Sequence, residues 1–294
     1  MDVDAYMAER ILLIDAAIDA RFTGSSKIPE SLESAMRHLL FPAGKRLRPV
    51  FALAAAEAIG GRAEAALPIA VAVELVHTYS LIHDDLPCMD DDVTRRGRPT
   101  VHVAYDEATA VLAGDALLTE AFAVLSEPSS AVAGAEAALF SVRCLAEAAG
   151  AAGLVGGQVD DLLFCSEVAD ARASASIAKE GAGRSRLASI HARKTASLFQ
   201  AAIVGGAALA GASETERETL AVFGKNVGIA FQIADDLLDA DSEEATSILR
   251  IQGTEDARQG AEGLLDHALL GIEGMCERAE PLRELARFAV RRTR

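Results

Sequence analysis

Apolar residues recur along most of the chain at intervals of three and four residues, the spacing that places them on one face of an α-helix. The segment 63–85 is apolar on nearly every face and is therefore expected to be buried. No stretch alternates between apolar and polar residues as a strand would. We therefore expect an all-α, single-domain helical bundle over residues 1–294. The pattern predicts helices over residues 6–20, 29–40, 50–59, 63–85, 101–125, 129–148, 191–210, 215–239, 264–272 and 279–292.

Three segments interrupt this periodicity. Residues 153–157 are rich in glycine and are predicted to form a flexible joint. Residues 169–189 are rich in Ala, Ser, Gly and charge, which indicates a mobile loop or a frayed helix. Residues 242–263 are polar without clear periodicity.

Composition narrows the classes of protein to consider. The 28 basic and 44 acidic residues give a net charge of −16, which argues against general nucleic-acid binding. Glu74 and His77 interrupt the best candidate for a membrane span, and the N-terminus lacks the pattern of a signal peptide, so we expect a cytoplasmic protein without a span. The four scattered cysteines are expected to be reduced and mostly buried thiols.

Two clusters of aspartates each follow a long apolar segment. Asp84 and Asp85 end the first segment, and the chain beyond Pro87 is expected to return Asp90 to the helix end. The second cluster contains Asp235, Asp236 and Asp239. A solvated acidic loop is the alternative for either cluster. Two acidic clusters on two apolar helices instead favour one shared site, and hard oxygen ligands suit Mg²⁺, with Mn²⁺ as a possible substitute.

Basic residues gather at the start of the apolar segment 50–59. Lys45, Arg46 and Arg48 lie within four residues, where a helix N-terminus would normally favour acids. A bound phosphate would explain them, and a surface basic patch is the alternative. His77 is seven residues before Asp84, on roughly the same helix face, and is either functional or a satisfied core histidine.

With these motifs the sequence resembles the trans-isoprenyl diphosphate synthases, specifically the bacterial farnesyl diphosphate synthase group of polyprenyl synthetases. The resemblance covers about residues 41–239. Its motifs are Gly-Lys-Arg-Leu-Arg-Pro at 44–49, His77, Asp-Asp-x4-Asp at 84–90, Arg-Arg-Gly-Arg-Pro-Thr at 95–100, Gly-Gly-Gln at 156–158, Lys194-Thr195 and Phe-Gln-x-x-Asp-Asp-x-x-Asp at 231–239.

The resemblance implies an isoprenoid synthase fold with a central apolar cavity, a homodimer, and condensation of isopentenyl diphosphate with an allylic diphosphate. The implied Mg²⁺ ligands are Asp84, Asp85, Asp90, Asp235, Asp236 and Asp239. The implied isopentenyl diphosphate pocket comprises Lys45, Arg48, His77 and Arg96. On the allylic side the implied residues are Arg95, Lys194, Thr195 and Gln232, with Lys225 as a weaker candidate.

The resemblance also implies a product and leaves alternatives. Tyr79 lies five residues before Asp84 and resembles the chain-length stop of farnesyl diphosphate synthases, or is an ordinary core tyrosine. Geranylgeranyl and geranyl diphosphate synthases, a terpene cyclase and a non-catalytic partner subunit remain alternatives. The match weakens after Asp239, because residues 241–263 contain no lysine where the family usually carries closing Gly-Lys segments. Arg250 or Arg258 is predicted to replace those lysines in part.

Overall fold

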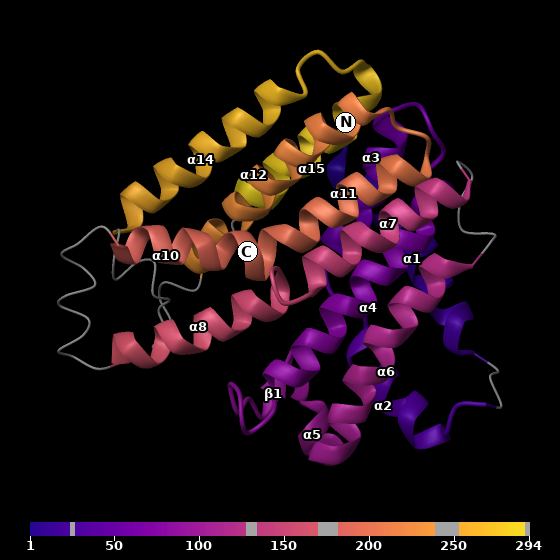
Figure 1. The fold of residues 1–294 in the computed structure, drawn as a ribbon, viewed down its shortest axis with the longest axis vertical. Helices are drawn as coiled ribbons and strands as arrows, with labels where there is room; N and C mark the ends of the chain where they lie inside the picture. Colours follow the sequence, from indigo (N-terminus) through magenta and orange to yellow (C-terminus); the bar gives the residue numbers. More distant parts are fainter. Residues whose placement is uncertain (24–26, 128–133, 170–181, 239–252, 292–294) are drawn as a thin grey trace.

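The computed structural model describes residues 1–23, 27–127, 134–169, 182–238 and 253–291 as a helical bundle (Figure 1). The predicted all-α architecture is confirmed for these residues. Three short helical segments, η1 (Ala63–Ala66), η3 (Ala192–Ala196) and η4 (Glu277–Ala279), join the longer ones. The α-helices are α1 (Val3–Phe22), α2 (Glu30–Leu40), α3 (Leu47–Ala58), α4 (Leu67–Asp84), α5 (Val101–Ala104), α6 (Glu107–Ser126), α7 (Ala135–Ala149), α8 (Leu154–Ala169), α10 (Ala182–His191), α11 (Ser197–Leu209), α12 (Glu214–Leu238), α14 (Thr254–Gly271) and α15 (Glu280–Arg291).

Helices α3, α4, α11 and α12 form the centre of the bundle. The ring of Phe51 on α3 lies 5.6 Å from Phe199 on α11 and 6.5 Å from Phe223 on α12. Gly206 allows α11 to approach α3 closely, because a Cβ there would lie 2.3 Å from the carbonyl oxygen of Ala52. Burial of these helices on most faces explains why their sequences are almost continuously apolar.

A two-stranded hairpin is the feature that the helical pattern does not predict. Strands β1 (Thr94–Arg95) and β2 (Arg98–Pro99) pair antiparallel, with Arg95 opposite Arg98. Arg96 and Gly97 between them both have positive φ, 53° and 73°, as a tight two-residue hairpin turn requires. The expectation of no strand was therefore wrong here, because a turn this short gives no periodic signal.

The helix predicted over residues 101–125 is two helices. The chain turns at Tyr105, and Asp106 starts α6 by accepting a hydrogen bond on Oδ1 from the backbone N–H of Thr109, at 2.8 Å. Such a side-chain cap stabilises a new helix start and so separates α5 from α6.

The glycines at 153–157 do not form a flexible joint. Gly156 and Gly157 lie in the first turns of α8. A Cβ on Gly157 would lie 2.5 Å from the backbone nitrogen of Lys194, so the glycine permits α8 to touch η3. The glycines therefore serve close packing rather than motion.

Two other irregular segments are partly helical. Residues 182–189 belong to α10 and residues 254–263 to α14, whereas 170–181 and 239–252 lie outside the described residues. The charged, exposed faces of these helices hide their periodicity. Cys88, Cys165 and Cys276 are exposed, so the expectation of mostly buried thiols was wrong.

Three helical stretches of the described chain are long and apolar enough to cross a membrane, judged by length and composition alone: residues 63–84, 107–126 and 135–167. Packing explains the first, since 78% of its apolar window is buried inside the bundle. The other two are only 39% and 33% buried. The absence of a membrane span stays a prediction.

Candidate active site

The first aspartate motif folds back over the end of α4, as the sequence predicts. The helix ends at Asp84, and the backbone N–H of Asp90 donates to the Asp84 carbonyl at 2.9 Å. Asp91 adopts a left-handed conformation, with φ of 55°, that tightens this loop. The return places the Asp84 and Asp90 carboxylates on either side of the helix terminus.

Asp85 of this motif is buried and Asp84 half-buried, which ionised carboxylates disfavour, while Asp90 is exposed at the surface. Burial raises the pKa of Asp84 to about 6, and burial also raises the pKa values of Asp85 and Asp90. Asp85 accepts a hydrogen bond on Oδ1 from Nε of Arg95 at 2.5 Å, while its buried Oδ2 has no hydrogen-bond partner among the described residues. Arg95 also donates to Asp92 at 2.9 Å. A bound cation would satisfy the orphaned oxygen and favour ionisation of all three groups.

Lys194 faces this motif from the other side. Its Nζ donates to Oδ2 of Asp161 on α8 at 2.6 Å. Burial lowers the pKa of the Lys194 ammonium, but Asp161, Asp84 and Asp90 together raise it above its usual value. Lys194 and Thr195 lie in the π-helical segment η3, a widened turn of the kind often found at functional sites. The local helix geometry thus presents Lys194 to the aspartates of α4.

A chain of side-chain contacts links η3 to the second aspartate motif. Oγ1 of Thr195 donates to Oε1 of Gln232 at 2.6 Å, and Nε2 of Gln232 donates to Oδ1 of Asp236 at 2.8 Å. Nε2 of His191 lies 3.3 Å from Oδ2 of Asp236. Both oxygens of Asp236 therefore face protein groups, and this carboxylate is turned away from the cavity that Asp235 lines.

All four residues of the predicted basic pocket gather around one cavity of about 650 Å³. Lys45, Arg48, His77 and Arg96 line it, and Asp235 of the second motif lies on the same wall. Burial, and then Arg48 and Arg96, hold the pKa of His77 well below its usual value, so His77 is neutral at pH 7. The guanidinium of Arg48 lies over the Phe199 ring, 4.7 Å from its centroid.

Arg96 is placed in this cavity by its backbone and by a glycine. Its φ of 53° follows from its position in the hairpin turn. The guanidinium lies against Gly44, where a Cβ would come within 2.6 Å of it, and NH1 donates to the Leu39 carbonyl at 3.2 Å. The Gly-Lys-Arg motif and the Arg-Arg-Gly motif therefore pack on one another.

Tyr79 lies where the spacing from Asp84 places it, inside the bundle. Its ring is buried and makes an edge-to-face contact with His83 at 5.7 Å. Burial and the charge of Asp84 raise the pKa of the Tyr79 hydroxyl to about 12. Tyr79 is thus a neutral, bulky group near the first aspartate motif.

Some predicted residues are not brought to this site. Lys225 is exposed on α12, ten residues or about 15 Å along the axis from Asp235. Arg258 is 64% exposed on α14, with NH1 3.6 Å from Glu255. Asp239 and Arg250 lie outside the described residues. Among the residues that are described, no three Asp, Glu, His or Cys side chains already form a metal-binding group.

Several polar residues of the site went unassigned at the sequence level. Asp161 holds Lys194, and His191 faces Asp236. Gln158, one helical turn before Asp161, is buried with neither side-chain amide atom hydrogen-bonded to a described residue. The sequence signal for Asp161 and Gln158 was their place next to the glycine pair at 156–157, whereas nothing in the sequence singled out His191.

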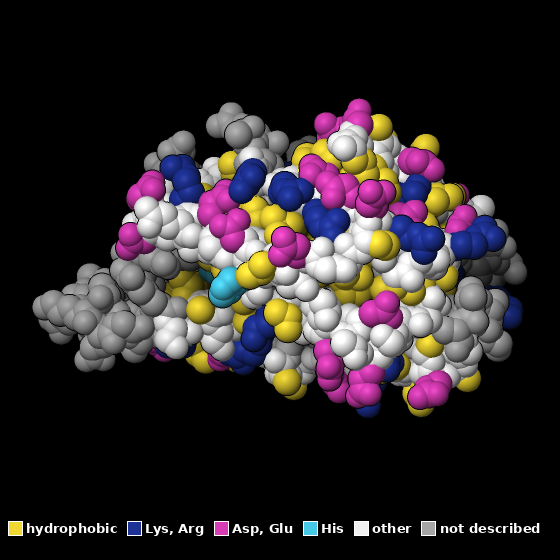
Figure 2. Space-filling model, turned by 90° about the horizontal axis from the view of Figure 1, so that it is seen from above, with side chains coloured by type: hydrophobic (Ala, Val, Ile, Leu, Met, Phe, Trp, Pro, Cys, Tyr) yellow, Lys and Arg dark blue, Asp and Glu magenta, His cyan; other side chains and the backbone are white. Residues whose placement is uncertain are grey.

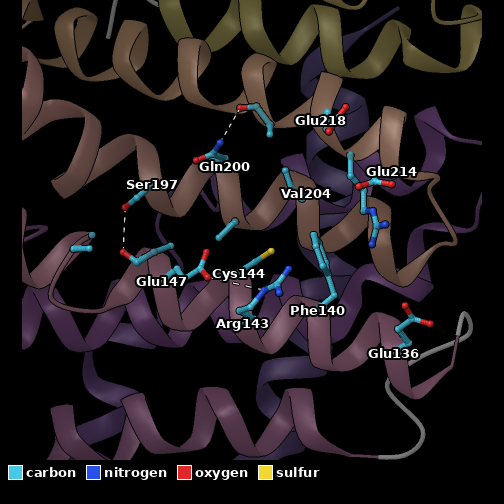
Figure 3. A pocket seen from close by; sticks show the side chains of 16 residues that line it. Glu136, Phe140, Arg143, Cys144, Glu147, Ser197, Gln200, Val204, Glu214 and Glu218 are labelled. Carbon is cyan, nitrogen blue, oxygen red and sulfur yellow. Dashed lines mark hydrogen bonds and ion pairs between the residues drawn. The ribbon is translucent and has the colours of Figure 1, made fainter.

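A second cavity of about 590 Å³ lies between α7, α11 and the start of α12 (Figure 3). Phe140 lies in its wall with the guanidinium groups of Arg143 and Arg217 over its ring, at 5.3 and 4.4 Å from the centroid. None of the site residues predicted from the sequence lines this cavity. Acidic and basic side chains are also intermixed on the face of the molecule seen in Figure 2, without a continuous basic field.

Comparison with known proteins identifies the family. The model of the polyprenyl synthetase family matches residues 29–264. This chain belongs to the polyprenyl synthetase family, and it is a prenyltransferase of that family. The farnesyl diphosphate synthase of Bacillus subtilis is 44% identical over 240 residues, which are 82% of this chain and 76% of that protein.

Other relatives differ in product. Geranylgeranyl pyrophosphate synthase 11 of Arabidopsis thaliana is 40% identical over 97% of this chain and 75% of its own length. The crystal structure of an FPP/GFPP synthase from Zymomonas mobilis superposes with a TM-score of 0.86 at 35% identity, covering 98% of this chain and 99% of the other. These similarities confirm the isoprenoid synthase fold and leave the product length open.

Proposed function

We propose that this prenyltransferase joins isopentenyl diphosphate head to tail with dimethylallyl and then geranyl diphosphate, giving mainly farnesyl diphosphate and pyrophosphate. The observation that carries this proposal is the position of Asp235 on the wall of the cavity that also contains Lys45, Arg48, His77 and Arg96. An aspartate of the second motif and the cations of the basic pocket therefore line the same cavity, as a reaction between two diphosphate esters requires. A terpene cyclase would have no use for the basic pocket.

The chain's cations assist the departure of the allylic diphosphate. Arg95 and Lys194 are held by Asp85 and Asp161 in the free protein, close to where the leaving group would lie. Ionisation separates charge, so fixed cations at the leaving oxygen lower its barrier. Mg²⁺ or Mn²⁺, held by Asp84, Asp85, Asp90, Asp235 and Asp239, would add positive charge at the same oxygens. A carboxylate has about four lone-pair positions, so Asp236 could join these ligands while it still faces Gln232 and His191.

Carbon–carbon bond formation takes place beside Thr195. Because Thr195 donates its proton to Gln232, its oxygen lone pairs remain free to face the allylic cation. The allylic carbon–oxygen bond breaks to give that cation and pyrophosphate, the isopentenyl double bond then attacks the cation, and a proton leaves the carbon next to the new cationic centre. We assign this proton to the departing pyrophosphate and to no protein base.

A homodimer in the cytoplasm is part of the proposal. Six large apolar side chains are exposed on three consecutive helices, α6, α7 and α8: Val111, Leu112, Leu139, Val155, Val159 and Leu163. A second copy of the chain packed on these helices would remove them from water without any membrane.

The first test is product analysis of the purified chain with Mg²⁺, isopentenyl diphosphate and dimethylallyl diphosphate. We expect mainly fifteen-carbon product from the wild type and products of twenty carbons or more from Tyr79→Ala, because the growing chain is expected to extend from the aspartates along α4, where the buried Tyr79 ring would stop it. Tyr105→Ala, which removes a tyrosine exposed on the surface, should not change the profile. A wild type that already makes twenty-carbon product would favour a geranylgeranyl diphosphate synthase, and one without product a non-catalytic partner subunit.

A further inference from the structure

The basic cavity contains a buried carboxylate whose presence the reaction does not explain. Glu74 lies on α4, three residues before His77, and lines the cavity together with Lys45, Arg48 and Arg96. Its residue surface is only 2% exposed. A negative charge in a pocket for diphosphate repels the ligand, so a simple anion pocket would not contain one.

Arg46 fixes this carboxylate in place. NH1 of Arg46 donates to Oε1 of Glu74 at 2.5 Å, and NH2 donates to the Leu40 carbonyl at 2.6 Å. Nε of Arg46 donates to Asp15 on α1 at 3.0 Å. The Arg46 side chain is fully buried, and its backbone is left-handed, with φ of 50°, at the start of α3. Arg46 is thus bonded to Glu74 and Asp15, and it borders the cavity together with Lys45, Arg48 and Arg96.

Four cationic side chains border the cavity, so their mutual repulsion must be offset when no ligand is bound. Burial lowers the pKa of Arg96, and Glu74 is the strongest charge that opposes this shift, while Arg46 and Arg95 add to it. Asp15 accepts a hydrogen bond from Arg46 and is not among the described residues that line the cavity. Glu74 is therefore the carboxylate placed to keep the unliganded arginines charged and apart.

We infer that Glu74, held by Arg46, is a positioning residue that limits the affinity of this pocket for a diphosphate group, so that the pocket can release its ligand. The inference rests on the proposed function, which makes the cavity the isopentenyl diphosphate site. The negative charge of Glu74, fixed beside Lys45, Arg46, Arg48 and Arg96, weakens diphosphate binding without touching the reacting carbons.

The experiment measures binding of inorganic pyrophosphate by calorimetry without divalent metal, alongside steady-state kinetics. Glu74→Gln keeps an acceptor for Arg46 and removes the charge, so we expect pyrophosphate to bind about tenfold tighter, given an effective dielectric constant of about 20. The KM for isopentenyl diphosphate should fall, and kcat should fall with it. Glu74→Asp retains the charge and should bind within about twofold of wild type, even if it is less stable. Asp15→Asn is the matched control outside the cavity and should also stay within about twofold.

The outcomes separate this inference from the function on which it rests. If wild type binds no pyrophosphate, or Arg48→Ala binds it equally well, the cavity is not a diphosphate pocket and the proposed function is wrong. If wild type binds and Glu74→Gln binds no tighter, Glu74 has only a structural role. If Glu74→Gln fails to fold, Arg46→Met is compared with Arg46→Met/Glu74→Gln: the second change should tighten pyrophosphate binding about tenfold, and no tightening would overturn the inference.

Discussion

In the site without bound substrates, the cationic side chains lie beside different partners. These partners indicate which of the two diphosphate substrates each cation would bind. Lys194 is bonded to Asp161 beside the first aspartate motif, whereas Arg48 lies in the basic cavity over Phe199. The two substrates should therefore depend on different cations.

Arg48→Ala should raise the KM for isopentenyl diphosphate more than that for the allylic diphosphate, and Lys194→Ala should do the reverse. Loss of one charge-assisted hydrogen bond costs about 1.5–3 kcal/mol, or roughly ten- to a hundredfold in KM. Steady-state kinetics with each substrate varied in turn measure the effect. Arg143→Ala, in the second cavity, is the control and should change neither KM. Equal effects of each site variant on both substrates would contradict separate anion pockets.

Asp84 should make the metal-free protein sensitive to pH. Its folded pKa of about 6 lies above the usual value of 3.8, so between these pH values the folded state keeps a proton that the unfolded chain has lost. The free energy of unfolding therefore falls as pH rises through about 4 to 6. Asp84→Asn should remove this fall in the free energy of unfolding. At pH 8 the variant of the metal-free protein should be more stable than wild type by no more than about 2 kcal/mol, because the Asp84 side chain is partly solvated.

Denaturant unfolding of wild type and Asp84→Asn at pH 5 and pH 8, both in chelator, checks this. The same variant should lose turnover by orders of magnitude in Mg²⁺, since the amide is a poorer cation ligand. A variant that is no more stable than wild type at pH 8 would show that burial of the ionised Asp84 carboxylate does not destabilise the folded protein.

Among the helices, close backbone contacts hold the site together. Gly157 at the start of α8 lies against the backbone of Lys194, so α8 and η3 keep Asp161 and Lys194 in register. No side chain larger than hydrogen fits between these segments.

Gly157→Ala should displace α8 from η3 and destabilise the fold by about 1–3 kcal/mol, because the neighbouring atoms belong to the backbone and cannot rotate away. The kcat should fall as Lys194 moves. Gly263→Ala in the exposed middle of α14, where the new Cβ meets nothing within 4 Å, should stabilise by about 0.5–1 kcal/mol. Thermal unfolding and kinetics of both variants distinguish a glycine required for close helix packing from an exposed glycine within a helix.

At the scale of the whole molecule, large apolar side chains on α6, α7 and α8 are exposed on the single chain. Leu112 and Leu139 are 59% and 69% exposed, on helices that contact one another. Leu270 is similarly exposed, at 66%, but on α14.

Light scattering after size exclusion should give twice the chain mass for wild type. The double variant Leu112→Glu/Leu139→Glu should give a monomer, because buried like charges across a two-fold interface are repelled and desolvated. Leu270→Glu should remain a dimer. A wild-type monomer, or a double variant that stays dimeric, would place the subunit interface elsewhere or remove it.

Apolar periodicity along the sequence was sufficient to predict the helical bundle, because a helix that buries one face or all faces must repeat its apolar residues in step with its turns. Pro87, which interrupts the helix after Asp84, was sufficient to predict that Asp90 returns to the end of α4. The order of the aspartate, cationic and glycine motifs along the chain was sufficient to recognise the family. The exposed cysteines and the Arg95–Arg98 hairpin were not predictable in this way, since neither burial of a single residue nor a two-residue turn leaves a periodic trace.

Only the tertiary structure decided how neighbouring charges divide their roles. Lys45, Arg46 and Arg48 are alike in sequence and all border the cavity, yet only Arg46 is fully buried and paired with Glu74 and Asp15, while Arg48 lies over the Phe199 ring. The aspartates at 235 and 236 divide similarly, one lining the cavity and the other turned to Gln232. A charged side chain takes whichever position its surroundings can neutralise, and those surroundings come from helices far apart in the chain.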